Sequence, residues 1–137
     1  MKKMVNHVLA LEAYTTLQQE RNVHLIDVRT HSEQVEYGVP KPGGDNKPLI
    51  TLSLTDESRS AINQAFLVGL QDGIKGMVQK TDKIFFICKS GQRSEIACNI
   101  AMECGYINAH NINSGFCGSH PNSWKASSLP WEYIAGN

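Results

Sequence analysis

The chain has 137 residues, of which 41% are hydrophobic and 19% are charged, and its 13 Lys and Arg balance its 13 Asp and Glu. This length fits one domain, 1–137, which can bury roughly 70% of its unfolded surface and needs no disulfide or metal to fold. The balanced charge, with no basic cluster interleaved with aromatics, argues against nucleic acid and anionic membranes as partners.

The start of the chain carries a charge pattern found in signal peptides, Met1-Lys2-Lys3, but the apolar stretch behind it is cut off at Glu12. That stretch is too short for a signal peptide, and no uncharged run is long enough to span a bilayer. We therefore expect a cytoplasmic protein whose four cysteines are reduced thiols: Cys88, Cys98, Cys104 and Cys117.

The first predicted elements alternate between helix and strand. Apolar side chains at positions 10, 13, 14 and 17 predict an amphipathic helix, and the run 23–28 predicts a buried strand. Thr30 and Glu33 match a capping box, which predicts a short helix that stops at Gly38.

The middle of the chain begins with a segment rich in Gly and Pro, 38–48, which predicts a loop. A short strand is expected at 49–52, followed by a helix that ends at the glycines 73 and 76. The apolar residues that predict this helix are Ile62, Ala65, Phe66 and Leu70.

The last third gives the clearest strand, 84–88, then a helix that stops at Gly105 and a short strand at 111–113. One face of this helix is predicted from Ile96, Ala97, Ile100, Ala101 and Cys104. We expect an irregular or helical tail in which Trp124 and Trp131 cover the core.

The alternation of strands and helices predicts an α/β fold with a mostly parallel sheet and helices on both faces. In such sheets the ligand site lies beyond the carboxyl ends of the strands. Asp27 and Cys88 both end predicted strands, so they mark the expected site.

Cys88 is the candidate nucleophile, because a glycine-containing loop, a cation and a helix follow it directly. The backbone N–H groups of residues 89–93 point inward if Gly91 adopts a conformation closed to other residues. Lys89, Arg93 and the helix N-terminus add positive charge, and such surroundings favour the thiolate. The alternative is a structural buried cysteine at a strand end.

The loop length distinguishes sulfur chemistry from phosphate chemistry. Loops of tyrosine-phosphatase-like enzymes have five residues between Cys and Arg, whereas this chain has four between Cys88 and Arg93. The shorter ring better fits one sulfur atom carried by the cysteine than a tetrahedral phosphate.

The loop 88–94 resembles the active-site loop of single-domain rhodaneses of the bacterial type. The segment 25–30, followed by Glu33 and Gly38, resembles the first signature of that family. Gly115-Phe116, Trp124 and 129–131 resemble its C-terminal signature, so the resemblance covers nearly the whole chain.

This resemblance implies a five-stranded, three-layer rhodanese-like domain and a thiosulfate:cyanide-type sulfurtransferase without cofactor or metal. Cys88 would take sulfur from a donor such as thiosulfate and pass it, as a persulfide, to a thiol, cyanide or protein acceptor. The implied anion-binding loop is Lys89, Ser90, Gly91, Gln92 and Arg93, with Asp27, Arg29 and Ser94 as supporting residues. Two other functions stay open, a persulfide carrier or protein-interaction module and a Cys-dependent phosphatase or arsenate reductase.

Several roles stay open at this point. The loop 38–44 lacks a histidine that the family often has there, which leaves the identity of donor and acceptor open. Asp27 either orients the loop, pairs with Arg29 or caps amides, and we expect Arg29 to pair with Glu33 or Glu36. Cys117 is either a resolving thiol or a spectator, Cys98 and Cys104 are expected in the core, and the Cys117-x-x-His120 spacing is a poor zinc candidate.

Overall fold

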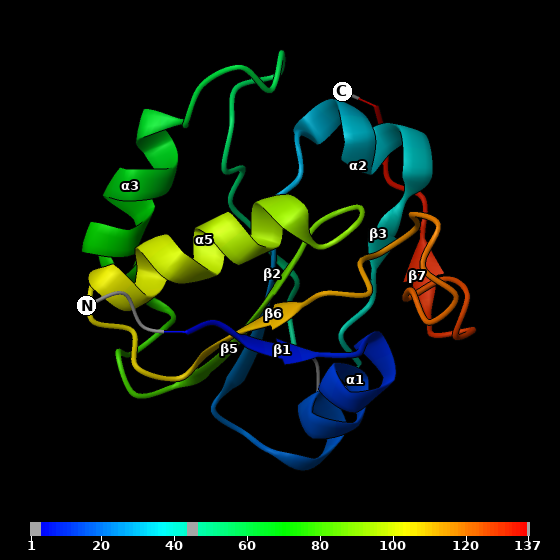
Figure 1. Cartoon of the computed structure of the whole chain (residues 1–137), viewed down its shortest axis with the longest axis horizontal. Helices are drawn as coiled ribbons and strands as arrows, with labels where there is room; N and C mark the ends of the chain where they lie inside the picture. The colour runs from blue at the N-terminus through cyan, green and yellow to red at the C-terminus, as the bar shows by residue number, and fades with distance from the viewer. Residues whose placement is uncertain (1–3, 44–46, 137) are drawn as a thin grey trace.

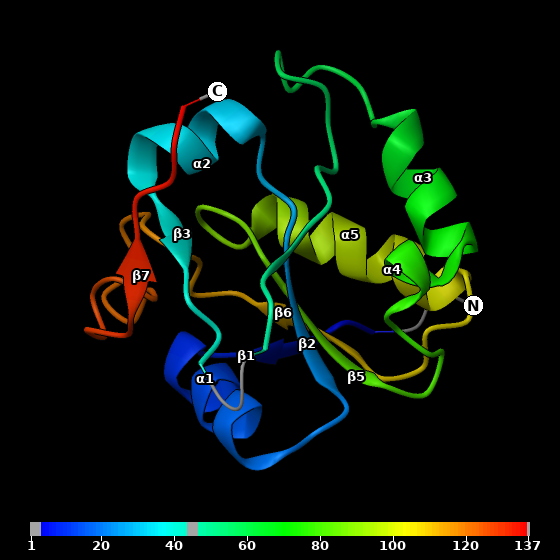
Figure 2. The same cartoon turned by 180° about the vertical axis from the view of Figure 1, so that it is seen from behind.

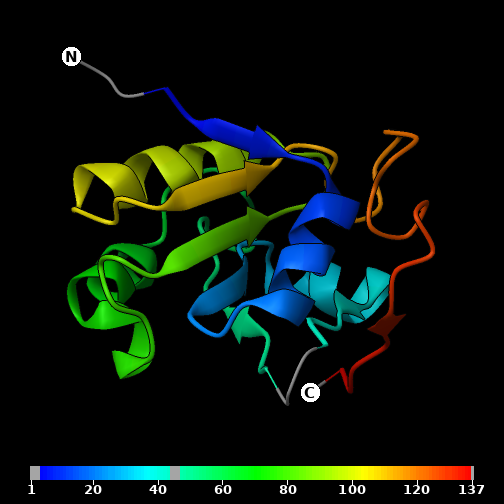
Figure 3. The same ribbon diagram turned by 90° about the horizontal axis from the view of Figure 1, so that it is seen from below.

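A five-stranded sheet forms the centre of the computed structural model. The structure describes residues 4–43 and 47–136. Met1-Lys2-Lys3 and Gly44, which the sequence analysis used, lie outside the described residues. The strand order is β1-β6-β5-β2-β4, and every neighbouring pair is parallel. The arrows of β1 (blue), β6 (gold) and β5 (green) point the same way in Figure 3. The strands are β1 Asn6–Val8, β2 Val23–Asp27, β4 Ile50–Thr51, β5 Lys83–Ile87 and β6 Ala109–Ile112. The predicted parallel sheet is confirmed, and β1 is an edge strand that the sequence pattern did not indicate.

Helices cover both faces of the sheet, as predicted (Figure 1). The first helix packs through Ala13 and Leu17 on one face, where Trp124 completes the cluster. On the other face Phe66 and Ala97 belong to a second cluster built from the remaining long helices. The helices are α1 Ala10–Gln19, α2 His31–Tyr37, α3 Gln64–Gln71, α4 Gly73–Gly76 and α5 Gln92–Glu103.

A second, two-stranded ribbon joins two segments that were expected to be irregular. β3 (Val39–Pro40) pairs antiparallel with β7 (Trp131–Glu132), and Figure 2 shows the two beside α2. Each strand has two residues, and its partner lies about ninety residues away, so no local periodicity marks it. The predicted loop and the predicted irregular or helical tail are wrong at these positions.

Three residues that the sequence pattern placed on buried helix faces are exposed: Ile62, Ile96 and Cys104. Ile62 is exposed and lies before α3, which begins only after Asn63. The Asn63 side chain caps the helix by accepting a hydrogen bond from the Ala65 amide. Ile96 and Cys104 are also exposed, although the sequence placed them on the buried face of α5. Cys98 is buried as expected, so the buried stripe of α5 is narrower than the apolar pattern suggested.

Within the part of the chain that the structure describes, no helix is long and apolar enough to cross a membrane. The single-domain boundaries and the cytoplasmic location stay predictions.

Candidate functional site

Cys88 directly follows the carboxyl end of β5, at the start of the loop that leads to α5, and it is only 1% exposed. The backbone N–H of Gly91 donates to Cys88 Sγ at 3.1 Å, and that of Ser94 donates at 3.3 Å. Ser94 Oγ lies 3.2 Å from the same sulfur. The sulfur therefore sits in a cradle of donors at a helix N-terminus, where negative charge on sulfur is favoured. Two amides donate to the sulfur: that of Gly91 belongs to the predicted set 89–93, and that of Ser94 lies outside it.

Gly91 provides the backbone conformation that closes this cradle, as predicted. Its φ is +92°, and a Cβ added there would lie 2.5 Å from the backbone oxygen of Asn113. The side chain of Asn111 donates from Nδ2 to the Gly91 carbonyl at 3.1 Å. The residues at the end of β6 thus hold the Cys88 loop against the sheet, and only glycine fits at position 91.

Asp27 pairs with Arg29, which was one of the alternatives for Asp27, and this pair corrects the expectation for Arg29. Arg29 donates from Nη2 to Asp27 Oδ2 at 2.7 Å, and both side chains are fully buried. The other Arg29 contacts are the Gly38 carbonyl at 2.7 Å and the Phe116 ring at 4.4 Å. The predicted pairing of Arg29 with Glu33 or Glu36 is wrong, because side chains two residues apart in extended backbone lie on the same side.

Glu33 pairs instead with Arg93, on the rim of the site. The two guanidinium nitrogens of Arg93 donate to the two carboxylate oxygens at 2.6 and 2.7 Å. Glu33 also completes the predicted capping box, since it accepts from the Thr30 amide while Thr30 Oγ1 accepts from the Glu33 amide. The charge of Arg93, expected to hold an anionic donor, is therefore compensated within the protein.

Burial alone would raise the pKa of Glu33, but hydrogen bonds and charge from Arg93, together with Thr30, lower it to about 2. The pKa of a glutamate in the unfolded chain is about 4.3. The Glu33 carboxylate therefore stabilises the fold above that pH, and this stabilisation is lost as the pH falls towards 2. We expect the difference in unfolding free energy between wild type and Glu33→Gln to shrink by about 1–3 kcal/mol between about pH 5 and pH 2. Urea unfolding of both proteins at each pH measures it, and a difference that is constant with pH would contradict the prediction.

A cavity of about 160 Å³ opens over the sulfur. Liquid water takes about 30 Å³ per molecule, so this space holds about five waters, enough for a small anion or the end of a thiol. The lining residues are Arg59, Cys88, Lys89, Ser90, Gln92 and Arg93. The Lys89 ammonium lies 4.7 Å from the centre of the Tyr37 ring, a cation–π contact at the side of the site.

Sequence reasoning missed two residues of this rim. Glu33 was recognised as a helix cap, and a glutamate at that position gives no sign of a partner sixty residues away. Arg59 lines the cavity from a loop that the sequence left unassigned. No local motif points to it, because only the tertiary fold brings that loop to Cys88.

Burial makes Cys98 and Cys117 less suited to nucleophilic chemistry. Burial raises the pKa of Cys98 to about 12, and burial also raises the pKa of Cys117 against the lowering effect of Arg29 and Lys125. Cys117 is not among the residues that line the cavity over Cys88, so its resolving role stays a prediction. No group of three or more His, Cys, Asp or Glu positioned for a metal is found among residues 4–43 and 47–136.

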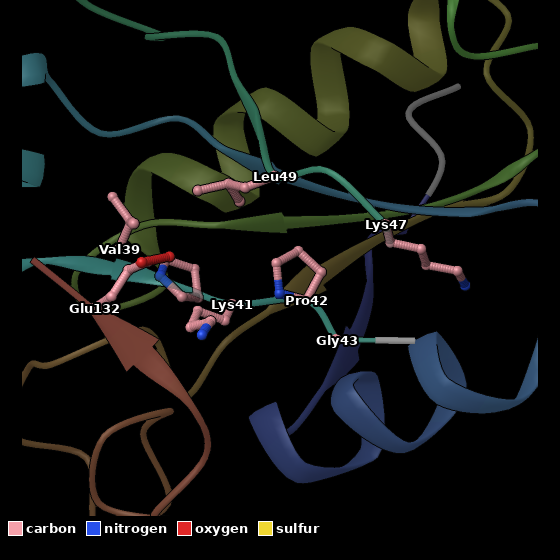
Figure 4. A pocket seen from close by; sticks show the side chains of 8 residues that line it. Val39, Lys41, Pro42, Gly43, Lys47, Leu49 and Glu132 are labelled. Atoms are coloured by element: carbon pink, nitrogen blue, oxygen red, sulfur yellow. The ribbon is translucent and has the colours of Figure 1, made fainter. Parts of the chain in front are cut away.

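A second cavity, of about 300 Å³, lies beside the ribbon of β3 and β7 (Figure 4). Its lining residues are Val39, Pro40, Lys41, Pro42, Gly43, Lys47, Leu49 and Glu132. None of them carries a thiol or hydroxyl, and none also lines the cavity over Cys88, so the two cavities are separate.

Comparison with known proteins agrees with the sequence resemblance. The family model of the rhodanese-like domain matches residues 10–120. The uncharacterized protein RP600 of Rickettsia prowazekii is 36% identical over 133 residues, which cover 95% of this chain and 99% of the relative. The crystal structure of Rv0390 from M. tuberculosis has a TM-score of 0.82 at 27% identity, covering 96% of this chain and 100% of that one. The polysulfide-sulfur transferase of Wolinella succinogenes shares the fold, with a TM-score of 0.67 at 20% identity over 96% of this chain and 80% of that one. The chain belongs to the rhodanese-like domain family.

Proposed function

We propose that the protein is a sulfurtransferase that carries sulfane sulfur as a persulfide on Cys88. The observation that carries this proposal is the sulfur itself, which accepts hydrogen bonds from the Gly91 and Ser94 amides at the floor of a small cavity. Family membership and the polysulfide-sulfur transferase among the structural neighbours support it.

In the first half-reaction the Cys88 thiolate attacks the outer sulfur of a donor such as thiosulfate. The new bond joins Sγ to that sulfur, the sulfur–sulfur bond of the donor breaks, and its electron pair leaves with sulfite. The cradle of amides then faces the persulfide, where an anion is again favoured.

In the second half-reaction a nucleophilic acceptor, a thiolate or cyanide, attacks the outer sulfur of the persulfide. The electron pair of the breaking bond returns to Sγ and regenerates the Cys88 thiolate. Because the two substrates react in turn at one atom, the kinetics are expected to be ping-pong. The cavity volume of about 160 Å³ favours a small donor, since pockets for drug-sized ligands typically have volumes of about 300 Å³ or more.

Incubation with thiosulfate is expected to add one sulfur atom, about 32 Da, to the intact protein, and cyanide should remove it with release of thiocyanate. Cys88→Ala should gain no sulfur, whereas Cys104→Ala, which alters an exposed thiol at the far end of α5, should behave as wild type. Absence of the added mass in wild type, or its presence in Cys88→Ala, would refute the proposal. Cys88-dependent hydrolysis of an aryl phosphate would favour phosphatase chemistry instead.

A further inference from the structure

Among the residues that the structure describes, Arg59 is the one cation lining the Cys88 cavity that neither hydrogen-bonds to a carboxylate nor stacks on a ring. Its guanidinium lies 3.8 Å from Glu33, a carboxylate already held by Arg93 at 2.6 Å. Lys89 lies over the Tyr37 ring. The Arg59 side chain is 54% exposed, so it can turn towards a ligand that enters the cavity.

The loop that carries Arg59 is built to hold it there. Thr55 and Ile62 form an antiparallel bridge, and between them the Asp56 carboxylate accepts from the Ser60 amide at 3.0 Å. The Arg59 amide donates to the Asp56 carbonyl at 2.9 Å. Arg59 itself has a φ of +61°, a conformation that side chains adopt rarely and that tertiary structure must maintain.

A second contact attaches this loop to the wall of the site. The Glu57 carboxylate accepts from the amides of His31 and Ser32 at 3.1 and 3.4 Å, at the start of α2. The same first turn of α2 carries Glu33. The loop and the Glu33–Arg93 pair are therefore positioned relative to one another through the same helix.

Arg59 and Arg93 both lie between the cavity and a shallow groove of about 260 Å³, since they line both. Ile62 and Ile96, both about half exposed, contribute apolar surface to that groove. A guanidinium beside apolar surface is less screened than one surrounded by water, which strengthens its attraction for an anion in the cavity.

We propose that Arg59, rather than Arg93, supplies the charge that recognises the anionic sulfur donor. This inference rests on the proposed sulfurtransfer at Cys88 and adds the residue that sets the affinity for the donor. Arg93 brings no net charge, because Glu33 neutralises it through two short hydrogen bonds. Arg59 thus carries the charge that an entering dianion such as thiosulfate meets on that side of the cavity.

The test measures persulfide formation as a function of thiosulfate concentration in wild type, Arg59→Gln and Arg59→Lys. Lys83→Gln, at the opposite end of β5, is the matched control that removes a charge remote from the site. A parallel series in the Cys88→Ser background measures binding of thiosulfate alone by NMR titration, where no sulfur can be transferred.

We expect Arg59→Gln to raise the half-saturating thiosulfate concentration and the dissociation constant about three- to tenfold, the range for one partly exposed cation and a doubly charged anion. The rate at saturation should change less than twofold, and the difference should fade at about 1 M salt, where the Debye length is about 3 Å. Arg59→Lys should keep most of the affinity, and Lys83→Gln should match wild type.

The inference would be overturned if wild type and Arg59→Gln had the same half-saturating thiosulfate concentration and the same dissociation constant. It would also be overturned if Arg59→Gln lowered only the rate at saturation. If no persulfide forms but Arg59→Gln still weakens thiosulfate binding in the Cys88→Ser background, the proposed function fails and the anion site stands. The two failures are therefore distinguishable.

Discussion

Replacing Asp27 by asparagine is expected to lower the free energy of unfolding by about 3–5 kcal/mol, because it leaves the buried guanidinium of Arg29 without its counter-charge. The two side chains are fully buried, and three hydrogen bonds from the Arg29 side chain reach the Asp27 carboxylate. Within the described residues Arg29 Nη1 already has no hydrogen-bond partner, so little remains to compensate a lost charge. Urea unfolding followed by circular dichroism measures the change.

The exposed pair of Glu20 and Lys83 provides the matched control. Their closest atoms lie 3.3 Å apart, and the side chains are 49% and 27% exposed. Glu20→Gln is expected to cost only about 0–1 kcal/mol, since water screens such pairs. The double variant with Asp27→Asn and Arg29→Met should be less destabilised than the sum of its single changes. A cost for Asp27→Asn no larger than that for Glu20→Gln would contradict this account of the buried pair.

The sequence was sufficient where one contiguous segment contains the whole signal. The apolar run before Cys88, the glycine at 91 and the helix after it are neighbours in the chain, and each has a local physical reason. The strand that ends before Cys88, the glycine-containing loop and the parallel sheet could therefore be predicted. The capping box of Thr30 and Glu33 was predicted for the same reason, and the structure confirms it.

Pairings between distant residues could not be predicted in this way. Glu33 serves one role that is local, the helix cap, and one that is not, the contact with Arg93. We expected Arg29 to pair with Glu33, but Glu33 pairs with the distant Arg93, and Arg29 pairs with Asp27, the local alternative that the sequence also allowed. The β3–β7 ribbon and Arg59 went unnoticed for the same reason, since in both the partner segment lies far along the chain.

Gly91→Ala is expected to abolish most persulfide formation and to lower stability by about 2 kcal/mol or more. A side chain at φ near +92° costs about 1–2 kcal/mol of backbone strain. The added Cβ would also lie 2.5 Å from the Asn113 backbone oxygen, so the loop has to move away from β6. That movement pulls the Gly91 amide from Cys88 Sγ and removes one of the two amide donors that hold the sulfur. Intact mass after incubation with thiosulfate, combined with urea unfolding, measures both effects.

Gly105→Ala separates the loss of site geometry from backbone strain alone. Gly105 follows α5 and has a φ of +96°, close to that of Gly91, but a Cβ there would meet only the Lys80 side chain at 3.8 Å or more. It should cost about 1–2 kcal/mol of stability through strain and leave persulfide formation near the wild-type rate. If both variants lose the reaction equally, the effect belongs to general destabilisation. If Gly91→Ala retains the reaction, the amide cradle is not what activates Cys88.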